Sequence, residues 1–150
     1  MAAFKFRLEA VLRLRQRFKE EKESELRALN EAKHIMEAEI AALEQELRNM
    51  DDALGAAVGE ILSVIDLQLA SQYSQRIDQR IKAKAAALAK LDGAIAGKRG
   101  ELVEAQRGVK SLERLRERQT EKFRREQDGA EQKFTDEVAQ RKFVVGPSRK

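Results

Sequence analysis

Apolar side chains recur at alternating steps of three and four residues along most of the chain, which is the spacing of a coiled-coil seam. In the first run 15 of 18 positions are apolar, and in the second 12 of 16 are. A double four-residue step from Phe18 through Lys22 to Leu26 predicts a local unwinding of the supercoil. The first seam comprises Phe4, Leu8, Val11, Arg15, Phe18, Lys22, Leu26, Leu29, Lys33, Met36, Ile40, Leu43, Leu47, Met50, Leu54, Ala57, Ile61 and Val64. The second comprises Ala70, Tyr73, Ile77, Ile81, Lys84, Leu88, Leu91, Ile95, Lys98, Leu102, Ala105, Val109, Leu112, Arg116, Gln119 and Phe123.

Glycines and capping residues separate the two seams. Gly55 and Gly59 each cost a helix about 1 kcal/mol relative to alanine, and Ser63 and Asp66 both suit the N-cap of a second helix. Near the other end, the Gly146-Pro147 pair is typical of a helix end. We therefore predict a single coiled-coil domain with helix 1 at about 4–57, a turn within 56–70, helix 2 at about 67–143 and a flexible tail at 144–150.

The distribution of charge indicates how the two helices pair. Residues 31–70 carry a net charge of −7 and residues 71–110 carry +5, so a fold-back places an acidic arm against a basic one. A parallel dimer would instead place like charges together. The sequence therefore predicts an all-α fold, a long antiparallel two-helix coiled-coil hairpin with a projecting C-terminal helix end, and a monomer. With a turn near residue 65, the numbers of facing residues sum to roughly 130 and each arm is about 90 Å long.

Composition argues against most catalytic chemistry. The 150 residues include no cysteine, one histidine and one proline, and 37% are charged. Without a second histidine or a cysteine, His34 is expected to be a solvated surface residue rather than a metal ligand or base. Gly93, Gly97, Gly100 and Gly108 form no phosphate-binding loop and indicate a weakened stretch of helix 2 or a close approach there. We predict a protein that is not an enzyme, with no catalytic residue, cofactor or metal.

The remaining function classes are interaction functions. The sequence pI of about 9.4 suggests nucleic-acid binding, but arginines alternate with glutamates within 112–122, which is typical of a solvated, salt-bridged face. We expect no nucleic-acid partner, no small-molecule substrate, and a cytoplasmic protein without a signal peptide. Leu12 and Leu14 lie off the seam, and such surplus apolar surface marks a docking site. A generic coiled-coil escort or chaperone, an injectisome stalk and, less favoured, a membrane-surface or nucleic-acid tether remain alternatives.

Three segments resemble the flagellar export protein family FliJ. They are the opening FKFRLEAVLRLR of Phe4–Arg15, the LERLRERQ of Leu112–Gln119 and the terminal DEVAQRKF of Asp136–Phe143. The resemblance implies a stalk-like adaptor of flagellar type III export, located at the cytoplasmic face of the inner membrane. The family's partners are the export ATPase ring, whose assembly and ATP hydrolysis it promotes, the cytoplasmic domain of the membrane export gate, and export chaperones.

The resemblance also implies which residues meet those partners. The gate-binding residues would be Tyr73 and Ile77, although both lie on the second seam and internal packing is an equal alternative for them. The ATPase-binding residues would be Phe4, Phe6, Leu8, Leu12, Arg13, Arg15, Asp136, Glu137 and Phe143.

Overall fold

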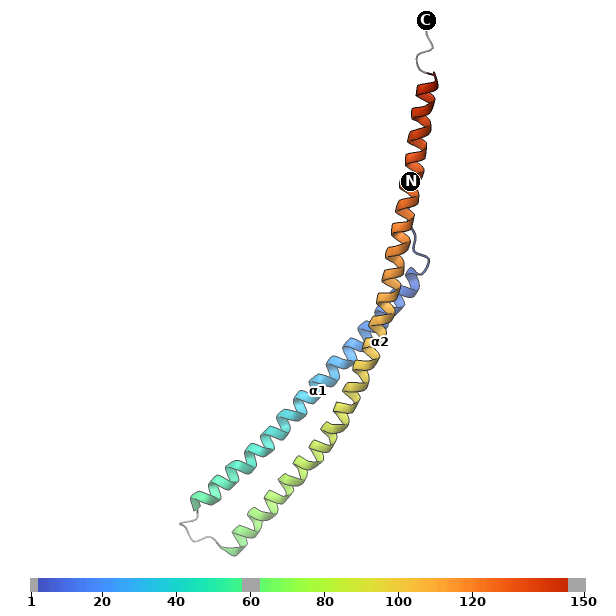
Figure 1. The fold of residues 1–150 in the computed structure, drawn as a ribbon. Helices are drawn as coiled ribbons and strands as arrows, with labels where there is room; N and C mark the ends of the chain where they lie inside the picture. Colours follow the sequence, from blue (N-terminus) through green and yellow to red (C-terminus); the bar gives the residue numbers. More distant parts are fainter. Residues whose placement is uncertain (1–2, 58–62, 146–150) are drawn as a thin grey trace. The chain divides into compact units, whose positions relative to one another are not determined.

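The computed structural model describes residues 3–57 and 63–145. It contains two long helices, α1 (Glu9–Ala56) and α2 (Val64–Val145), and no strand within these described residues. The helices pack against each other in antiparallel orientation, as Figure 1 shows for the cyan-to-green part of α1 beside the green-to-yellow part of α2. The predicted all-α helical hairpin is confirmed.

A reciprocal cap fixes the start of α2. The Ser63 Oγ accepts a hydrogen bond from the backbone N–H of Asp66 at 3.1 Å, and the Asp66 carboxylate accepts one from the N–H of Ser63 at 3.4 Å. Such a capping box satisfies two backbone donors that the first helical turn leaves unpaired. Ser63 is therefore the N-cap, and Asp66 is its partner in the first turn. The predicted turn region was 56–70, whereas α1 ends at Ala56 and α2 starts at Val64. Residues 58–62, between the two helices, lie outside the described residues.

The start of α1 differs from the prediction. Residues 3–8 are not helical, and α1 begins at Glu9 rather than near residue 4. The Glu9 N–H donates to the carbonyl oxygen of Phe6 at 3.1 Å, which turns the chain into the helix. This turn lets Phe6 reach the same apolar core as Leu12. At the other end α2 continues to Val145, so the first two residues of the predicted tail are helical, and residues 146–150 lie outside the described residues.

The chain divides into two compact units, and the single coiled-coil domain stays a prediction. Unit 1 contains residues 1–19 and 104–150, and unit 2 contains residues 20–103. The core of unit 1 consists of Phe6, Leu12 and Val109, with the partly buried Phe4, Leu8, Leu112 and Leu115 packed against it. Here the predicted first seam is wrong: Val11 and Phe18 are exposed, and Leu12 is buried instead. The one-residue rotation follows from the fold-back of residues 3–8, because Leu12 lies on the face of α1 toward Phe6.

In unit 2 the predicted seams agree with burial. Ile77 and Ile95 of α2 are buried, while Tyr73 at the start of the second seam is exposed. The α1 side of this interface is half-buried at every seam position from Lys22 to Leu54, namely Lys22, Leu26, Leu29, Lys33, Met36, Ile40, Leu43, Leu47, Met50 and Leu54.

The register of the hairpin differs from the prediction by about one heptad. In unit 2, Lys33 contacts Asp92 and Lys22 contacts Glu101, and the residue numbers in these pairs sum to about 123–125 rather than 130. In unit 1, Phe123 stacks on Phe4, with ring centroids 5.6 Å apart. The start of α2 at Val64 agrees with this lower sum, because the reversal then lies closer to the N-terminus than the predicted midpoint.

Truncation of Leu12 should destabilise unit 1. Leu12 is 1% exposed, so Leu12→Ala removes buried methyl groups and leaves a cavity, at an expected cost of about 2–5 kcal/mol. Urea unfolding followed by circular dichroism at 222 nm measures this loss. The matched control is Leu14→Ala, two residues away and 67% exposed, which should change stability by less than about 0.5 kcal/mol. Equal losses for both variants would contradict the described core.

Candidate functional surfaces

Unit 1 brings residues of its N-terminal segment, 1–19, and of its C-terminal segment, 104–150, to one surface. Glu9 of α1 lies 3.7 Å from Arg116, and this ion pair links the first turn of α1 to α2. Glu9 also lies 3.9 Å from Arg13 in the next turn of α1. Arg15 lies across Gly108, where a Cβ atom would stand 3.0 Å from its Nη1. Gly108 therefore gives the arginine room at the helix contact. By contrast, an added Cβ at Gly93, Gly97 or Gly100 would meet nothing within 4 Å, so the close approach expected from these glycines is limited to Gly108.

The structure separates the predicted ATPase-binding residues into two groups. Phe6 and Leu12 are buried, and Phe4 and Leu8 are half-buried against them, so these four residues build the core of unit 1. The others are exposed and available to a partner, namely Arg13, Arg15, Asp136, Glu137 and Phe143.

The C-terminal part of α2 carries the most exposed apolar side chains of unit 1. Phe134 is 69% exposed and Phe143 is 85% exposed, and Val144 next to it is equally open. Asp136 accepts a hydrogen bond from the Gln132 amide one turn earlier, at 3.3 Å. The orange-to-red part of α2 in Figure 1 extends beyond the N-terminal segment, so these side chains have no share in the core around Leu12.

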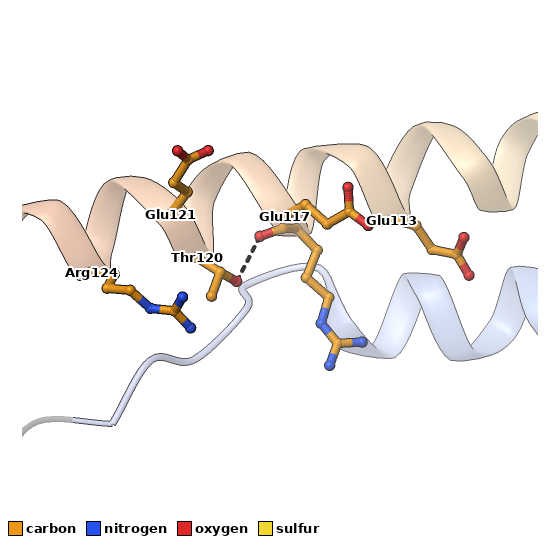
Figure 2. Close-up of a pocket in the computed structure, with 6 residues that line it drawn as sticks. Glu113, Glu117, Thr120, Glu121 and Arg124 are labelled. Atoms are coloured by element: carbon orange, nitrogen blue, oxygen red, sulfur yellow. Dashed lines mark hydrogen bonds between the residues drawn. The ribbon is translucent and has the colours of Figure 1, made fainter.

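A surface groove of about 500 Å³ follows α2 beside the N-terminal segment. Figure 2 shows acidic and basic side chains along this stretch of the helix, with the non-helical N-terminal segment running next to them. The Thr120 hydroxyl donates to the backbone carbonyl of Arg116 at 2.7 Å, so this hydroxyl is used within the helix. Opposite charges placed one turn apart suit the recognition of a polar protein surface. The lining residues are Glu113, Arg116, Glu117, Thr120, Glu121 and Arg124.

Unit 2 presents a second surface near the start of α2. Tyr73 is 45% exposed and its hydroxyl donates to the Glu46 carboxylate of α1, which raises the pKa of Tyr73. Ile77 is buried against α1, so internal packing is its role in this structure. A groove of about 490 Å³ next to Glu46 runs between the helices, lined by Glu39, Ala42, Leu43, Glu46, Arg80 and Lys84.

The seam pattern wrongly assigns Val64 to the buried stripe, and it does not identify the other exposed apolar residues just before Tyr73. These residues occupy adjacent and alternate positions, so they cannot all face α1 when the chain becomes helical. That crowding of apolar residues on several faces of one predicted helix is the signal that could have identified them. They are Val64, Ile65, Leu67 and Leu69.

Side chains of opposite charge join the two helices at the end of unit 2 that lies far from the turn. Lys22 contacts Glu25 at 3.4 Å and Glu101 at 3.2 Å, and Lys98 contacts the same two carboxylates at 2.7 and 3.1 Å. The four groups form a closed ring to which each helix contributes one lysine and one glutamate. Hydrogen bonds from Lys98 lower the pKa of Glu25 and of Glu101, and the two carboxylates raise the pKa of Lys98.

The described residues offer no site for a metal ion, since no group of three or more possible ligands comes together in residues 3–57 and 63–145. His34 is largely exposed, 3.8 Å from Glu37 on the same face of α1, in agreement with a solvated position. Within the same ranges no helix is both long and apolar enough to cross a bilayer.

These observations define a helical hairpin in which the segment before α1 shares a core with α2, and in which exposed apolar residues lie at the start and in the C-terminal part of α2, among other places. The model of the family described as "Flagellar FliJ protein" matches residues 4–148, nearly the whole chain. The chain therefore belongs to the FliJ family and is a component of the flagellar export apparatus, in a family that is not catalytic. Comparisons with curated proteins and with solved structures gave no match.

The charge ring predicts how stability depends on pH. The folded-state pKa values of Glu25 and Glu101 lie below the ordinary 4.5, so their contribution is present above pH 4.5 and is lost as the pH falls through the lowered values. The raised pKa of Lys98 has its effect only at strongly basic pH. The double variant Glu25→Gln/Glu101→Gln should be less stable at pH 7 and should lose less stability between pH 7 and pH 3. Thermal unfolding followed by circular dichroism measures both effects.

The matched control replaces two exposed glutamates of α1, Glu31 and Glu44, with glutamine. This control should keep the pH dependence of the unmodified protein. An identical pH profile for the ring variant and the unmodified protein would show that the ring does not contribute to stability.

Proposed function

We propose that the chain is a non-enzymatic stalk and adaptor of the export apparatus, which binds the export ATPase ring and promotes its assembly and ATP hydrolysis. The observation that carries this proposal is unit 1, in which the N-terminal segment and α2 are joined by one core around Leu12. The ring would bind a preformed composite surface and would not have to order the segment that precedes α1, which lowers the entropic cost of binding.

The exposed residues of unit 1 supply the chemistry for such binding. Phe134 and Phe143 offer apolar anchors, and aromatic anchors tend to dominate protein interfaces. Arg13 and Arg15 offer exposed guanidinium groups that pair well with carboxylates. Phe6 and Leu12 would act indirectly, because they hold the N-terminal segment on α2.

Loss of the aromatic anchors should weaken ATPase stimulation. The unmodified protein should raise the turnover and ring formation of the purified export ATPase, and Phe134→Ala/Phe143→Ala should require at least about tenfold more protein for half-maximal stimulation. Both side chains are exposed, so helix content and melting temperature should stay unchanged. Steady-state ATP hydrolysis and electron microscopy of the rings are the measurements.

The matched control is Ile35→Ala/Val103→Ala, which removes exposed apolar side chains from unit 2 and should stimulate normally. Failure of the unmodified protein to change either turnover or ring formation would refute the stalk proposal. Normal stimulation by the phenylalanine variant would remove only the C-terminal part of α2 from the interface.

We further propose that the surface around Tyr73 contacts the cytoplasmic domain of the membrane export gate, and that the exposed apolar residues before it serve in escorting export chaperones. Tyr73 is supported by its exposure and by the neighbouring groove between the helices. Ile77 would support the contact from beneath, since it packs against α1.

Replacing Tyr73 should separate gate binding from ATPase stimulation. Tyr73→Ala should bind the gate domain about tenfold or more weakly in isothermal titration calorimetry, because tyrosines are frequent anchors of interfaces. Tyr73→Phe keeps the ring and removes only the hydrogen bond to Glu46, so it should retain most of the affinity. Unchanged affinity of Tyr73→Ala would exclude this surface, whereas its ATPase stimulation should be normal in either case.

A further inference from the structure

Four lysines of unit 2 occupy seam positions at which coiled coils usually place leucine or isoleucine. Each lysine is half-buried, and Lys22 is the least accessible, with 15% of its side chain exposed. Each ammonium group lies 2.6–3.2 Å from a carboxylate oxygen of the other helix. The cross-helix pairs are Lys22–Glu101, Lys33–Asp92, Lys84–Glu39 and Lys98–Glu25.

The apolar seam residues do not by themselves determine how far one helix is shifted along the other. Seam positions alternate strictly by three and four residues within 26–54 and within 81–102. A shift of one heptad, about 10 Å along the helix axis, therefore places seam positions opposite seam positions again. The buried apolar area changes little in such a shift, so another interaction has to select the register.

The lysines distinguish the observed register from its neighbours. If the sum of facing residue numbers rises by seven, only Lys84 still meets a carboxylate, that of Glu46. The other three lysines then face Gly108 (Lys22), Arg99 (Lys33) and Ala32 (Lys98). If the sum falls by seven, no lysine meets a carboxylate, and the facing residues are Ala94, Ala85, Ala32 and Phe18.

We propose that the four seam lysines set the register of the hairpin and exclude registers displaced by one heptad. A half-buried lysine side chain that faces alanine loses its carboxylate partner, and one that faces arginine is repelled, which penalises the shifted registers. A polar residue at a seam position is known to select register at some cost in stability.

Pulsed electron–electron double resonance measures the distance between two spin labels and therefore tests the register directly. The chain has no cysteine, so Ala28→Cys/Ala85→Cys provides two labels on exposed positions, one on each helix, outside the seams and not adjacent to the three lysines that are replaced below. In the observed register position 28 faces residue 95, ten residues from the second label, an axial separation of about 15 Å. One heptad changes that separation to about 25 Å or about 5 Å, so both shifts are recognisable.

Two sets of substitutions should shift the register. In K22M/K33E/K98M the two methionines remove the cross-helix pairs of Lys22 and Lys98. The glutamate introduced at position 33 is repelled by Asp92 in the observed register. In the register whose sum is higher by seven, the same glutamate is attracted by Arg99. We expect a second population with a distance about 10 Å greater along the axis. Adding Asp92→Lys restores attraction across the helices in the observed register and should recover most of the original distance.

The variant K22M/K33M/K98M separates register from stability. Methionine fills the seam and offsets part of the attraction that is lost with the charge ring, so helix content should be retained while the distance distribution splits. The matched control R76M/K82M/K90M removes three exposed positive charges of α2 and should keep one distance. A single, unmodified distance in both lysine variants, or splitting in the control, would overturn the proposal. If K22M/K33E/K98M loses helix content, the methionine variant alone decides the matter.

Discussion

The mutual burial of two apolar seams is the interaction on which the rest of this structure depends. Each long helix carries an apolar stripe that only the other helix covers, and a two-helix contact is one side chain deep. Few described apolar residues are therefore buried, namely Phe6, Leu12, Ile77, Ile95, Ala105 and Val109. A core this thin has little apolar surface to spare, so caps, polar seam residues and register acquire an importance that they would lack in a thicker core.

The same thin contact explains how binding surfaces arise without a deep pocket. In unit 1 the N-terminal segment adds Phe6 to the helix–helix core and leaves Arg13 and Arg15 exposed beside α2. In unit 2 the buried Ile77 lies one turn from the exposed Tyr73. Neighbouring residues of one helix thus supply both the buried contact and the exposed surface. Membership of the FliJ family relates both surfaces to flagellar export.

Periodicity predicted the fold well where a helix has one apolar stripe and poorly where it has two. From Lys22 to Leu54 the predicted seam coincides with the half-buried face of α1. Between Phe4 and Phe18 the sequence allows two apolar stripes. The stripe that contains Leu12 is the buried one, because the non-helical segment before Glu9 brings Phe6 to the same side. The family resemblance alone could not show which of the predicted ATPase-binding residues are buried and which are exposed, since phenylalanine and leucine occur both in cores and at binding surfaces.

By itself the sequence determined two long helices, their antiparallel pairing and the place of the reversal, because seam spacing, opposite charge and the Ser63–Asp66 cap are local or additive signals. Only the tertiary structure decided the register and the residues left exposed. Heptad-related alignments bury the same apolar stripes, and the contacts that distinguish them, such as Lys33 with Asp92 and Phe4 with Phe123, join residues far apart in the chain. Such contacts exist only once both helices are placed side by side.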